Sequence, residues 1–461
     1  MKKVFTVIVL LICNCMFGQS LVRFAAIGDF GKAGTNELNV SNLVKGWNPE
    51  FIITLGDNNY ELGEQSTIDI NIGYYYQEFI YPYTGIYGTG DTVNRFFPSL
   101  GNHDWYTSQA AAYLSYFTLP GNERYYDFVK GNVHFFSIDS DPNEPDGIDS
   151  NSVQGLWLKN ALANSTQKWN IVYFHHPPFS SAQHGSQAYM QWPFKRWGAT
   201  TVMAGHDHTY ERIMIDSLLY FVNGLGGKSI YSFNSVVPGS QLRYNNNYGA
   251  MLINSYSDSM VFKFYSVSGN QRDYYRLLPP AKKLSLKVYV QGFYDATADT
   301  ATADTVNILL RNSFAPYSVV DSSVGVPDVY GNVILEFLKA DNATSYYVSI
   351  KHRNSIETWS STGMIFISNS MILDMTSSAA SAFGSNLKLI DPSPIAFGLY
   401  GGDVDQNGFI NATDVSMVDN GVANYDSGYV LTDLTGNNFV DGTDFLIADN
   451  NAAIYAEVIT P

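Results

Sequence analysis

Short apolar runs alternate with loops and helical patterns over residues 21–280. Each run has the length of a strand buried in a sheet. Strands that alternate with helices in this way predict a layered α/β domain. The expected strands are residues 22–27, 51–55, 96–100, 133–138, 171–174, 200–204 and 219–222. The expected helices are residues 36–47, 108–116 and 153–163.

Five short polar motifs lie at or just past the ends of expected strands. In chain order they are Gly28-Asp29-Phe30-Gly31, Gly56-Asp57-Asn58-Asn59-Tyr60, Gly101-Asn102-His103-Asp104, Val172-Tyr173-Phe174-His175 and Gly205-His206-Asp207-His208. Ligands gather at the carboxyl ends of strands in sheets of this kind. The motifs therefore stand where a ligand-binding site is expected.

The motifs supply two carboxylates, a phenol, a carboxamide and three imidazoles. Hard oxygen ligands mixed with imidazole suit iron, zinc or manganese rather than calcium. The neighbouring glycines let the backbone turn sharply and come close to a ligand. A single Asp-x-Gly can be only a turn, and a lone histidine is commonly structural. Five such motifs at successive strand ends favour a metal site.

The order of these motifs resembles that of the calcineurin-like metallophosphatase superfamily, over about residues 21–275. Tyr60, three residues after Asp57, resembles the purple acid phosphatases within that superfamily. The resemblance implies a layered β-sandwich with flanking helices. It also implies an acid phosphatase in which a metal-bound hydroxide attacks small-molecule phosphate monoesters.

The same resemblance implies a ligand set for two ions. Asp29, Asp57, Tyr60 and His208 would hold Fe(3+). A divalent ion of iron, zinc or manganese would be held by Asp57, Asn102, His175 and His206, with Asp57 bridging. A phenolate and two carboxylates favour the trivalent ion, whereas a carboxamide and two neutral imidazoles leave the other position less negative.

Two further histidines match residues that contact substrate in the family. His103 would face the phosphate or give a proton to the leaving group, or else it only orients a ligand. His184, in Ala182-Gln183-His184-Gly185, resembles a second substrate-contacting loop. His176 is expected to support a ligand, and His134 and His352 are expected to be structural. Trp105 stands where smaller members have another histidine, so Trp105, Tyr106 and Phe179 either flank an apolar leaving group or pack at the rim.

Two rival functions remain open at this point. A phosphodiesterase or nucleotidase would use the same metals. A binding or scaffold protein with a decayed phosphatase domain is the other rival, and retention of all seven ligand positions argues against it.

The sequence changes character after Pro279-Pro280. Apolar and polar residues alternate over 284–290, and residues 306–310 and 346–350 look similar. Residues 295–304 form a small repeat of Asp, Ala and Thr that is expected to be a loop. The pattern predicts an antiparallel β-sandwich over residues 281–398.

The tail, residues 399–461, holds two similar acidic segments. Side chains with oxygen ligands recur at positions 1, 3, 5, 9 and 12 of each segment. This spacing lets a short loop wrap Ca(2+), and the backbone carbonyl of position 7 is a further ligand. Asn438 replaces the glycine of the second loop and tolerates left-handed backbone. The paired loops resemble a small helical dockerin module, which implies a cohesin-like docking partner, although related modules only stabilise the end of an enzyme. A solvated acidic tail is the alternative. The expected calcium ligands are Asp403, Asp405, Asn407, Phe409, Asn411 and Asp414, then Asp433, Thr435, Asn437, Phe439, Asp441 and Asp444.

The first residues resemble a signal peptide. Lys2 and Lys3 precede an apolar run that is too short to span a membrane comfortably, and we expect residues 1–19 to be removed on export to the periplasm or the exterior. Cys13 and Cys15 are the chain's two cysteines, so the mature protein would have no disulfide and no thiolate ligand. A net charge of −16 argues against nucleic-acid or anionic-membrane binding. The metallophosphatase domain is thus expected over residues 20–280.

Overall fold

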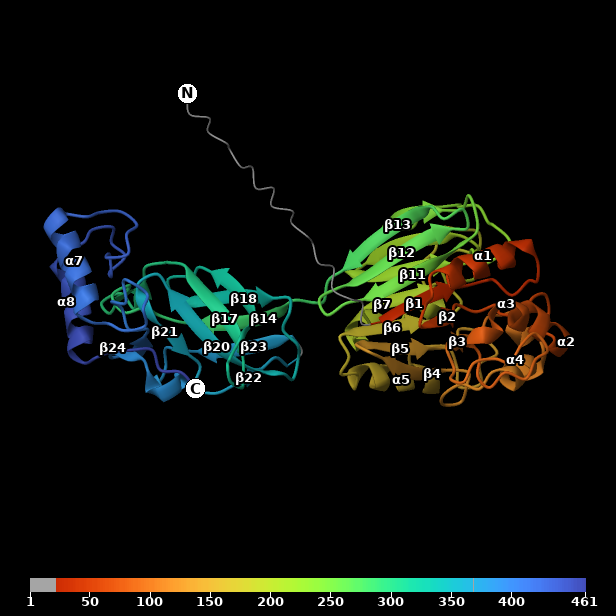
Figure 1. Cartoon of the computed structure of the whole chain (residues 1–461), viewed down its shortest axis with the longest axis horizontal. Coiled ribbons are helices and arrows are strands. Elements are labelled where there is room, and N and C mark those ends of the chain that lie inside the picture. Colours follow the sequence, from red (N-terminus) through yellow and green to blue (C-terminus); the bar gives the residue numbers. More distant parts are fainter. Residues whose placement is uncertain (1–21, 368) are drawn as a thin grey trace, which may run out of the picture. The chain divides into compact units, whose positions relative to one another are not determined.

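The computed structural model describes residues 22–367 and 369–461 (Figure 1). The expected signal peptide, residues 1–19, and both cysteines lie outside the described residues. The first compact unit ends at Pro279, and the second runs from Pro280 to Pro461.

The first unit is built on two mixed sheets. The six-stranded sheet has the order β13-β12-β11-β1-β2-β3, and the seven-stranded sheet has the order β10-β8-β9-β7-β6-β5-β4. Phe24 and Phe51 of the first sheet pack against Phe135 of the second, with ring centroids 5.0 Å and 5.3 Å apart. The main apolar core therefore lies between the two sheets. The strands are β1 (Val22–Ile27), β2 (Phe51–Thr54), β3 (Phe96–Pro98), β4 (Tyr126–Lys130), β5 (Val133–Ser137), β6 (Trp169–Tyr173), β7 (Thr201–Ala204), β8 (Tyr210–Ile215), β9 (Leu218–Asn223), β10 (Ser240–Tyr244), β11 (Gly249–Ser255), β12 (Met260–Ser266) and β13 (Gln271–Leu277).

Parallel pairing at the centre of each sheet sets the position of the polar motifs. β1, β2 and β3 run parallel, as do β5, β6, β7 and β9. Their register aligns Ile27 with Thr54 and Thr54 with Pro98. The carboxyl ends of these strands lie at one edge of each sheet, and the motifs follow them.

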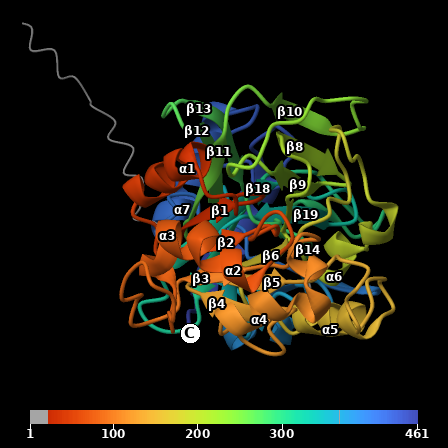
Figure 2. The same ribbon diagram turned by 90° about the vertical axis from the view of Figure 1, so that its right-hand side faces the viewer.

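Helices cover the outer surfaces of the sheets. α1 (Thr35–Gly46) contacts β11 and α3, which can be followed in Figures 1 and 2. Leu158 and Leu162 of α5 join a second apolar cluster with Val172 and Phe174, on the other side of the seven-stranded sheet from the main core. The remaining helical segments are α2 (Gln65–Ile68), α3 (Tyr74–Tyr76), α4 (Ala111–Tyr116), α5 (Val153–Ala163) and α6 (Phe194–Trp197).

Two helical features differ from the expectation. The helix expected over 108–116 is regular only from Ala111, because Gln109 and Ala110 have φ of 57° and 50°, which an α-helix does not accommodate. The helical turns between β2 and β3 carry no sustained apolar stripe and were not expected from the pattern.

The second unit contains a sheet of order β19-β14-β23 and a sheet of order β18-β17-β20-β21, with β22 on β20. Leu286, Ile308 and Val348 from these two sheets lie in one buried apolar cluster. The loop expected over 295–304 is wrong in part, because Asp295 and Thr300 pair in a small hairpin. The strands are β14 (Lys282–Lys287), β15 (Tyr294–Asp295), β16 (Thr300–Ala301), β17 (Val306–Asn312), β18 (Val319–Gly325), β19 (Asn332–Phe337), β20 (Ser345–His352), β21 (Ser355–Trp359), β22 (Met364–Ile365), β23 (Ser370–Asp374), β24 (Lys388–Pro392) and β25 (Ile395–Gly398).

The acidic tail forms two contacting helices, α7 (Ala412–Asn424) and α8 (Gly442–Ala453). Each starts with a capping box, made by Asn411 with Asp414 and by Asp441 with Asp444. Val418 and Ala448 pack with Leu434 in a small core of their own. None of the helices in the described part of the chain is long and apolar enough to cross a membrane.

Candidate metal centre and active site

The strand ends deliver all seven proposed transition-metal ligands to one place. Asp29 follows β1, Asp57 follows β2 and Asn102 follows β3, while His175 follows β6 and His206 follows β7. Tyr60 and His208 lie a few residues further along two of these loops. Within this group, Asp29, Asp57 and His175 offer ligand atoms that all lie within 4.8 Å of one another.

One cluster of ligand atoms surrounds the Tyr60 hydroxyl. That oxygen lies 3.1 Å from Asp29 Oδ1, 2.8 Å from Asp57 Oδ2 and 3.2 Å from His208 Nε2. A phenol has one proton, so it can donate to only one of the two carboxylates, and His208 Nε2 donates or accepts according to its tautomer. The crowding of oxygen and nitrogen lone pairs around one point suits a cation.

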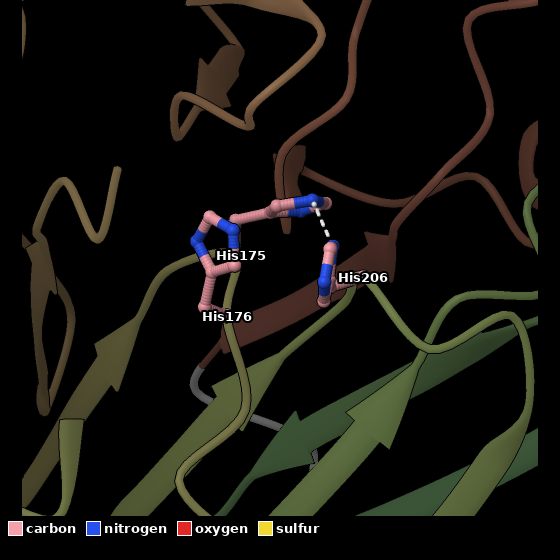
Figure 3. Close-up of side chains that lie close together, drawn as sticks. All are labelled: His175, His176 and His206. Carbon is pink, nitrogen blue, oxygen red and sulfur yellow. Dashed lines mark hydrogen bonds between the residues drawn. The ribbon is translucent and has the colours of Figure 1, made fainter. Parts of the chain in front are cut away.

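A second cluster surrounds His175 Nε2. His175 Nδ1 lies 2.8 Å from the Leu55 carbonyl and must donate to it, so Nε2 of the neutral ring carries a lone pair. Nε2 lies 3.1 Å from Asn102 Oδ1, 3.4 Å from Asp57 Oδ1 and 3.2 Å from His206 Nδ1. Figure 3 shows His206 facing His175, with His176 beside them. In this cluster, too, hydrogen-bond acceptor atoms lie close together without enough N–H or O–H groups to donate to them.

Asp57 belongs to both clusters. Its Oδ2 faces Tyr60 and its Oδ1 faces His175. The side chain is almost fully buried. A carboxylate that presents one oxygen to each of two clusters of ligand atoms has the arrangement needed to bridge two cations.

Electrostatics couple these groups strongly. Burial alone would raise the pKa of Asp57, but His175 and His103 hold it below its ordinary value. Burial alone would lower the pKa of His175, and without a bound cation the Asp57 carboxylate raises it to about 10, so the ring then holds a second proton. A cation at Nε2 would replace that proton and leave the neutral ring. Burial and the two neighbouring carboxylates raise the pKa of Tyr60 well above that of a free phenol. A cation in the Tyr60 cluster would offset that penalty and favour the phenolate.

Backbone geometry at the site is strained where ligands enter it. Asp29, Asp57 and His206 have φ of 55°, 52° and 67°, in the left-handed region that non-glycine residues avoid. Each such residue costs about 1–3 kcal/mol, and strain of this kind concentrates at functional sites. Gly101 is required for another reason, because a Cβ there would lie 2.1 Å from the Asp57 amide nitrogen.

The buried Asp104 joins two of the ligand loops and was missed by the sequence reasoning. Its carboxylate accepts from the Asn58 and Gly101 backbone amides and from Asn58 Nδ2. Burial, and then the charge of Asp57, raises the pKa of Asp104 to about 7. Its position beside Asn102 and His103 in the third motif was the available signal.

His103 lies at the solvent side of the site. Its backbone amide donates to Asp57 Oδ1 over 2.9 Å, and its Nε2 lies 3.9 Å from Asp57 Oδ2. Its ring packs 4.4 Å from the Tyr60 ring and 4.9 Å from the Tyr106 ring. The ring is therefore held next to both the ligands and the solvent.

His184 reaches the same place from a loop far along the chain. Its ring stacks on His206 with centroids 4.3 Å apart. Asp207, which is fully buried, fixes that loop by accepting from the backbone amides of His184 and Gly185 and from the Ser180 hydroxyl. Asp207 lies between two proposed ligands in sequence, and nothing in the pattern showed that it holds this loop.

The other residues singled out by the sequence divide into one that lies beside the proposed ligands and several that lie away from them. His176 packs 4.4 Å from His206 and bonds to Ser140, and burial lowers its pKa to about 3. His134 pairs with Asp127 outside the site, and His352 lies in the second unit. Trp105 is not at a rim, because it is buried and donates to Asp139. Tyr106 is exposed, and Phe179 packs on Tyr220.

The two acidic loops of the tail have matching geometry. Asp403 accepts from the backbone amides of Asn407 and Gly408, and Asp433 accepts from those of Gly436, Asn437 and Asn438. Asp403, Asp405 and Asp414 offer oxygens within 4.8 Å of one another. Burial, and then the nearby Asp414, raises the pKa of Asp403 to about 6.

The backbone of Asn438 has φ of 69°, in the left-handed region. The remaining expected ligands follow in the same loops: Asn411 and Asp441 cap the helices, Asp444 accepts from Leu434 and Thr435, and the side chains of Phe409 and Phe439 are exposed.

Comparison with known proteins finds similarity over the part of the chain that holds the site. Residues 22–210, which include all five motifs, match the calcineurin-like phosphoesterase family. Tartrate-resistant acid phosphatase type 5 of Oryctolagus cuniculus is 24% identical over 270 residues, covering 50% of this chain and 80% of that protein. Purple acid phosphatase 3 of Arabidopsis thaliana is 26% identical over 288 residues, covering 54% of this chain and 75% of that protein. The solved structure of purple acid phosphatase PPD1 from yellow lupin superposes with a TM-score of 0.46 at 17% identity, over 56% of this chain and 53% of that one.

Proposed function

We propose that this chain, a metal-dependent phosphoric ester hydrolase with a calcineurin-like metallophosphatase domain, hydrolyses phosphate monoesters as a purple acid phosphatase. The observation that carries the proposal is the shared carboxylate of Asp57, with one oxygen toward Tyr60 and the other toward His175. A phenol ligand beside a bridging carboxylate is the feature by which the sequence resembles that group of phosphatases.

The donor sets support a trivalent and a divalent ion. Asp29, Asp57, Tyr60 and His208 combine anionic oxygens with one imidazole and suit Fe(3+). Asp57, Asn102, His175 and His206 are less negative and suit divalent iron, zinc or manganese. When bound, such a pair of ions binds the phosphate oxygens, acidifies a water molecule and stabilises the charge that develops in the transition state.

His103 and His184 supply the protein's own part of the chemistry. They approach the clusters from two sides, His103 over the Tyr60 ring and His184 over the His206 ring. Both can donate to a phosphate oxygen when protonated, and His103 can give its proton to the leaving group. Asp104 keeps the loop of His103 in place, and Asp207 keeps the loop of His184 in place.

The test uses the visible spectrum of the iron-loaded enzyme. Electron transfer from a Tyr60 phenolate to Fe(3+) absorbs visible light, so the wild type should be violet or pink. Tyr60→Phe should lose the band and keep some hydrolysis, because Asp57 and the histidines still hold metal. Tyr106→Phe is the matched control, since the Tyr106 ring also packs on His103 and, within the described part of the chain, its hydroxyl has no hydrogen bond to a proposed ligand. An iron-loaded wild type without the band, or a Tyr60→Phe variant that keeps it, would refute the purple acid phosphatase assignment.

For the second unit we propose a β-sandwich with a dockerin-like tail that binds two Ca(2+) ions. Two independent loops with the same ligand spacing and the same backbone bonds to their first Asp support this. Asp414→Asn and Asp444→Asn should each remove one calcium site in a titration of the full chain. Asp419→Asn, an exposed change on α7 outside the loops, should leave both sites. Full calcium binding by both loop variants would contradict the proposal. We expect a cohesin-like docking partner to bind the tail only when the tail holds calcium.

Export is proposed from residues 1–19 alone. N-terminal sequencing of the mature protein from the culture medium or the periplasm should show a chain that starts after this segment. A protein that retains Met1 and stays in the cytoplasm would contradict it.

A further inference from the structure

Lys228 lies against the ring of Tyr60. Its Nζ is 4.7 Å from the centroid of that ring. The backbone amide of Lys228 donates to the Asp29 carbonyl over 3.1 Å, which ties the loop after β9 to the loop after β1. The ammonium is thus held beside a phenol whose oxygen lies among the proposed ligands.

Glu61 anchors this ammonium. Glu61 Oε1 pairs with Lys228 Nζ and also with Lys32 Nζ, the latter over 3.0 Å. The two lysines differ in their surroundings: the Lys228 side chain is 19% exposed, whereas that of Lys32 is 47% exposed. Solvent therefore screens the charge of Lys228 less than that of Lys32.

We propose that Lys228 is a positioning residue that acts through Tyr60 and sets the energy of electron transfer from the metal-bound phenolate to the metal. A cation near an aromatic ring is attracted by the ring's electrons, and the attraction increases when the ring carries a negative charge. The inference rests on the proposed function, in which Tyr60 binds Fe(3+).

The consequence is a defined direction of spectral change. The charge of Lys228 lowers the energy of the phenolate electrons, so their transfer to Fe(3+) requires more energy than it would without the lysine. Removing the charge should move the visible band to longer wavelength. Lys32 shares the same carboxylate but makes no contact with the ring in the described structure, so its removal tests whether any nearby positive charge has this effect.

The experiment compares iron-loaded wild type with Lys228→Met, Lys228→Gln, Lys228→Arg and Lys32→Met, at equal iron content. Both neutral variants at 228 should shift the band to longer wavelength. Lys228→Arg should restore the wild-type position, because it keeps the charge, and Lys32→Met should leave it unchanged. Two neutral substitutions of different polarity are used so that misfolding of one does not decide the result.

The outcomes separate the two proposals. A wild type that holds iron without a visible band would refute the proposed function, and this inference with it. A coloured wild type whose band does not move in either neutral variant would refute the inference alone. An equal shift in Lys32→Met would also refute it. A rise in KM without any band shift would show that Lys228 binds the substrate instead, which overturns the positioning role.

Discussion

Replacing Glu37 by Gln should stabilise the protein increasingly as the pH rises. Glu37, in the first turn of α1, is fully buried, and the Lys32 backbone amide offsets only part of the cost of burying its charge. Burial raises its pKa well above the ordinary value of 4.5. The folded protein then holds a proton that the unfolded chain releases, so stability is fully present below pH 4.5 and falls as the pH rises through the folded pKa.

The size of the effect follows from proton linkage. Each pH unit between the unfolded and folded pKa values costs about 1.4 kcal/mol of unfolding free energy. In a domain of this size, 1 kcal/mol moves Tm by about 2–4 °C. The gain in Tm of Glu37→Gln over the wild type should therefore grow by about 3–6 °C per pH unit, then level off above the folded pKa.

Calorimetry of the metal-loaded proteins between pH 4.5 and pH 8 measures this difference. Taking the difference between the variant and the wild type cancels the pH dependence that both proteins share. Glu64→Gln is the matched control, because Glu64 is exposed and its variant should track the wild type at every pH. A constant or shrinking difference between Glu37→Gln and the wild type would refute the claim that Glu37 is buried as a neutral acid.

The remaining predictions concern the ligand loops. Gly101→Ala should cost about 1–3 kcal/mol of stability and lower kcat/KM for an aryl phosphate, because the added Cβ would overlap the Asp57 amide. Gly46→Ala should do neither, because no described residue outside the helix's own backbone lies within 4 Å of a Cβ added there. Asp207→Asn should raise KM about tenfold, the equivalent of ~1.4 kcal/mol, with iron content unchanged, because the loop of His184 loses a charged acceptor. An unchanged KM, measured by steady-state kinetics, would show that this loop does not contact the substrate.

The sequence predicted the parts of the site that depend on local chemistry. The strand expected over 22–27 and the helix expected over 153–163 have those bounds in the structure. The strand is a short apolar run, whereas the helix carries an apolar stripe and begins after the capping residue Ser152. Glycine-flanked polar residues at strand ends likewise marked the ligand loops. A local pattern was sufficient there, since strand ends and turns are set by neighbouring residues.

Other features depend on contacts between distant segments and carry no local signal. β10 is half-exposed and lacks a continuous apolar run, so its pairing with β8 could not be read from it. Trp105 was expected either to flank an apolar leaving group or to pack at the rim, yet it is buried and its indole N–H donates to Asp139. Asp207 is the clearest case, because its role depends on a loop more than twenty residues earlier in the chain.

The most direct test of the account is the metal content of Asp57→Asn. The wild type, loaded with iron and zinc, should hold two ions per folded chain and hydrolyse an aryl phosphate. Asp57→Asn should keep its fold by circular dichroism, lose at least one ion by elemental analysis and lose hydrolysis, whereas Asp127→Asn, outside the site, should match the wild type. An Asp57→Asn protein with its full metal content and undiminished activity would contradict the shared-carboxylate centre.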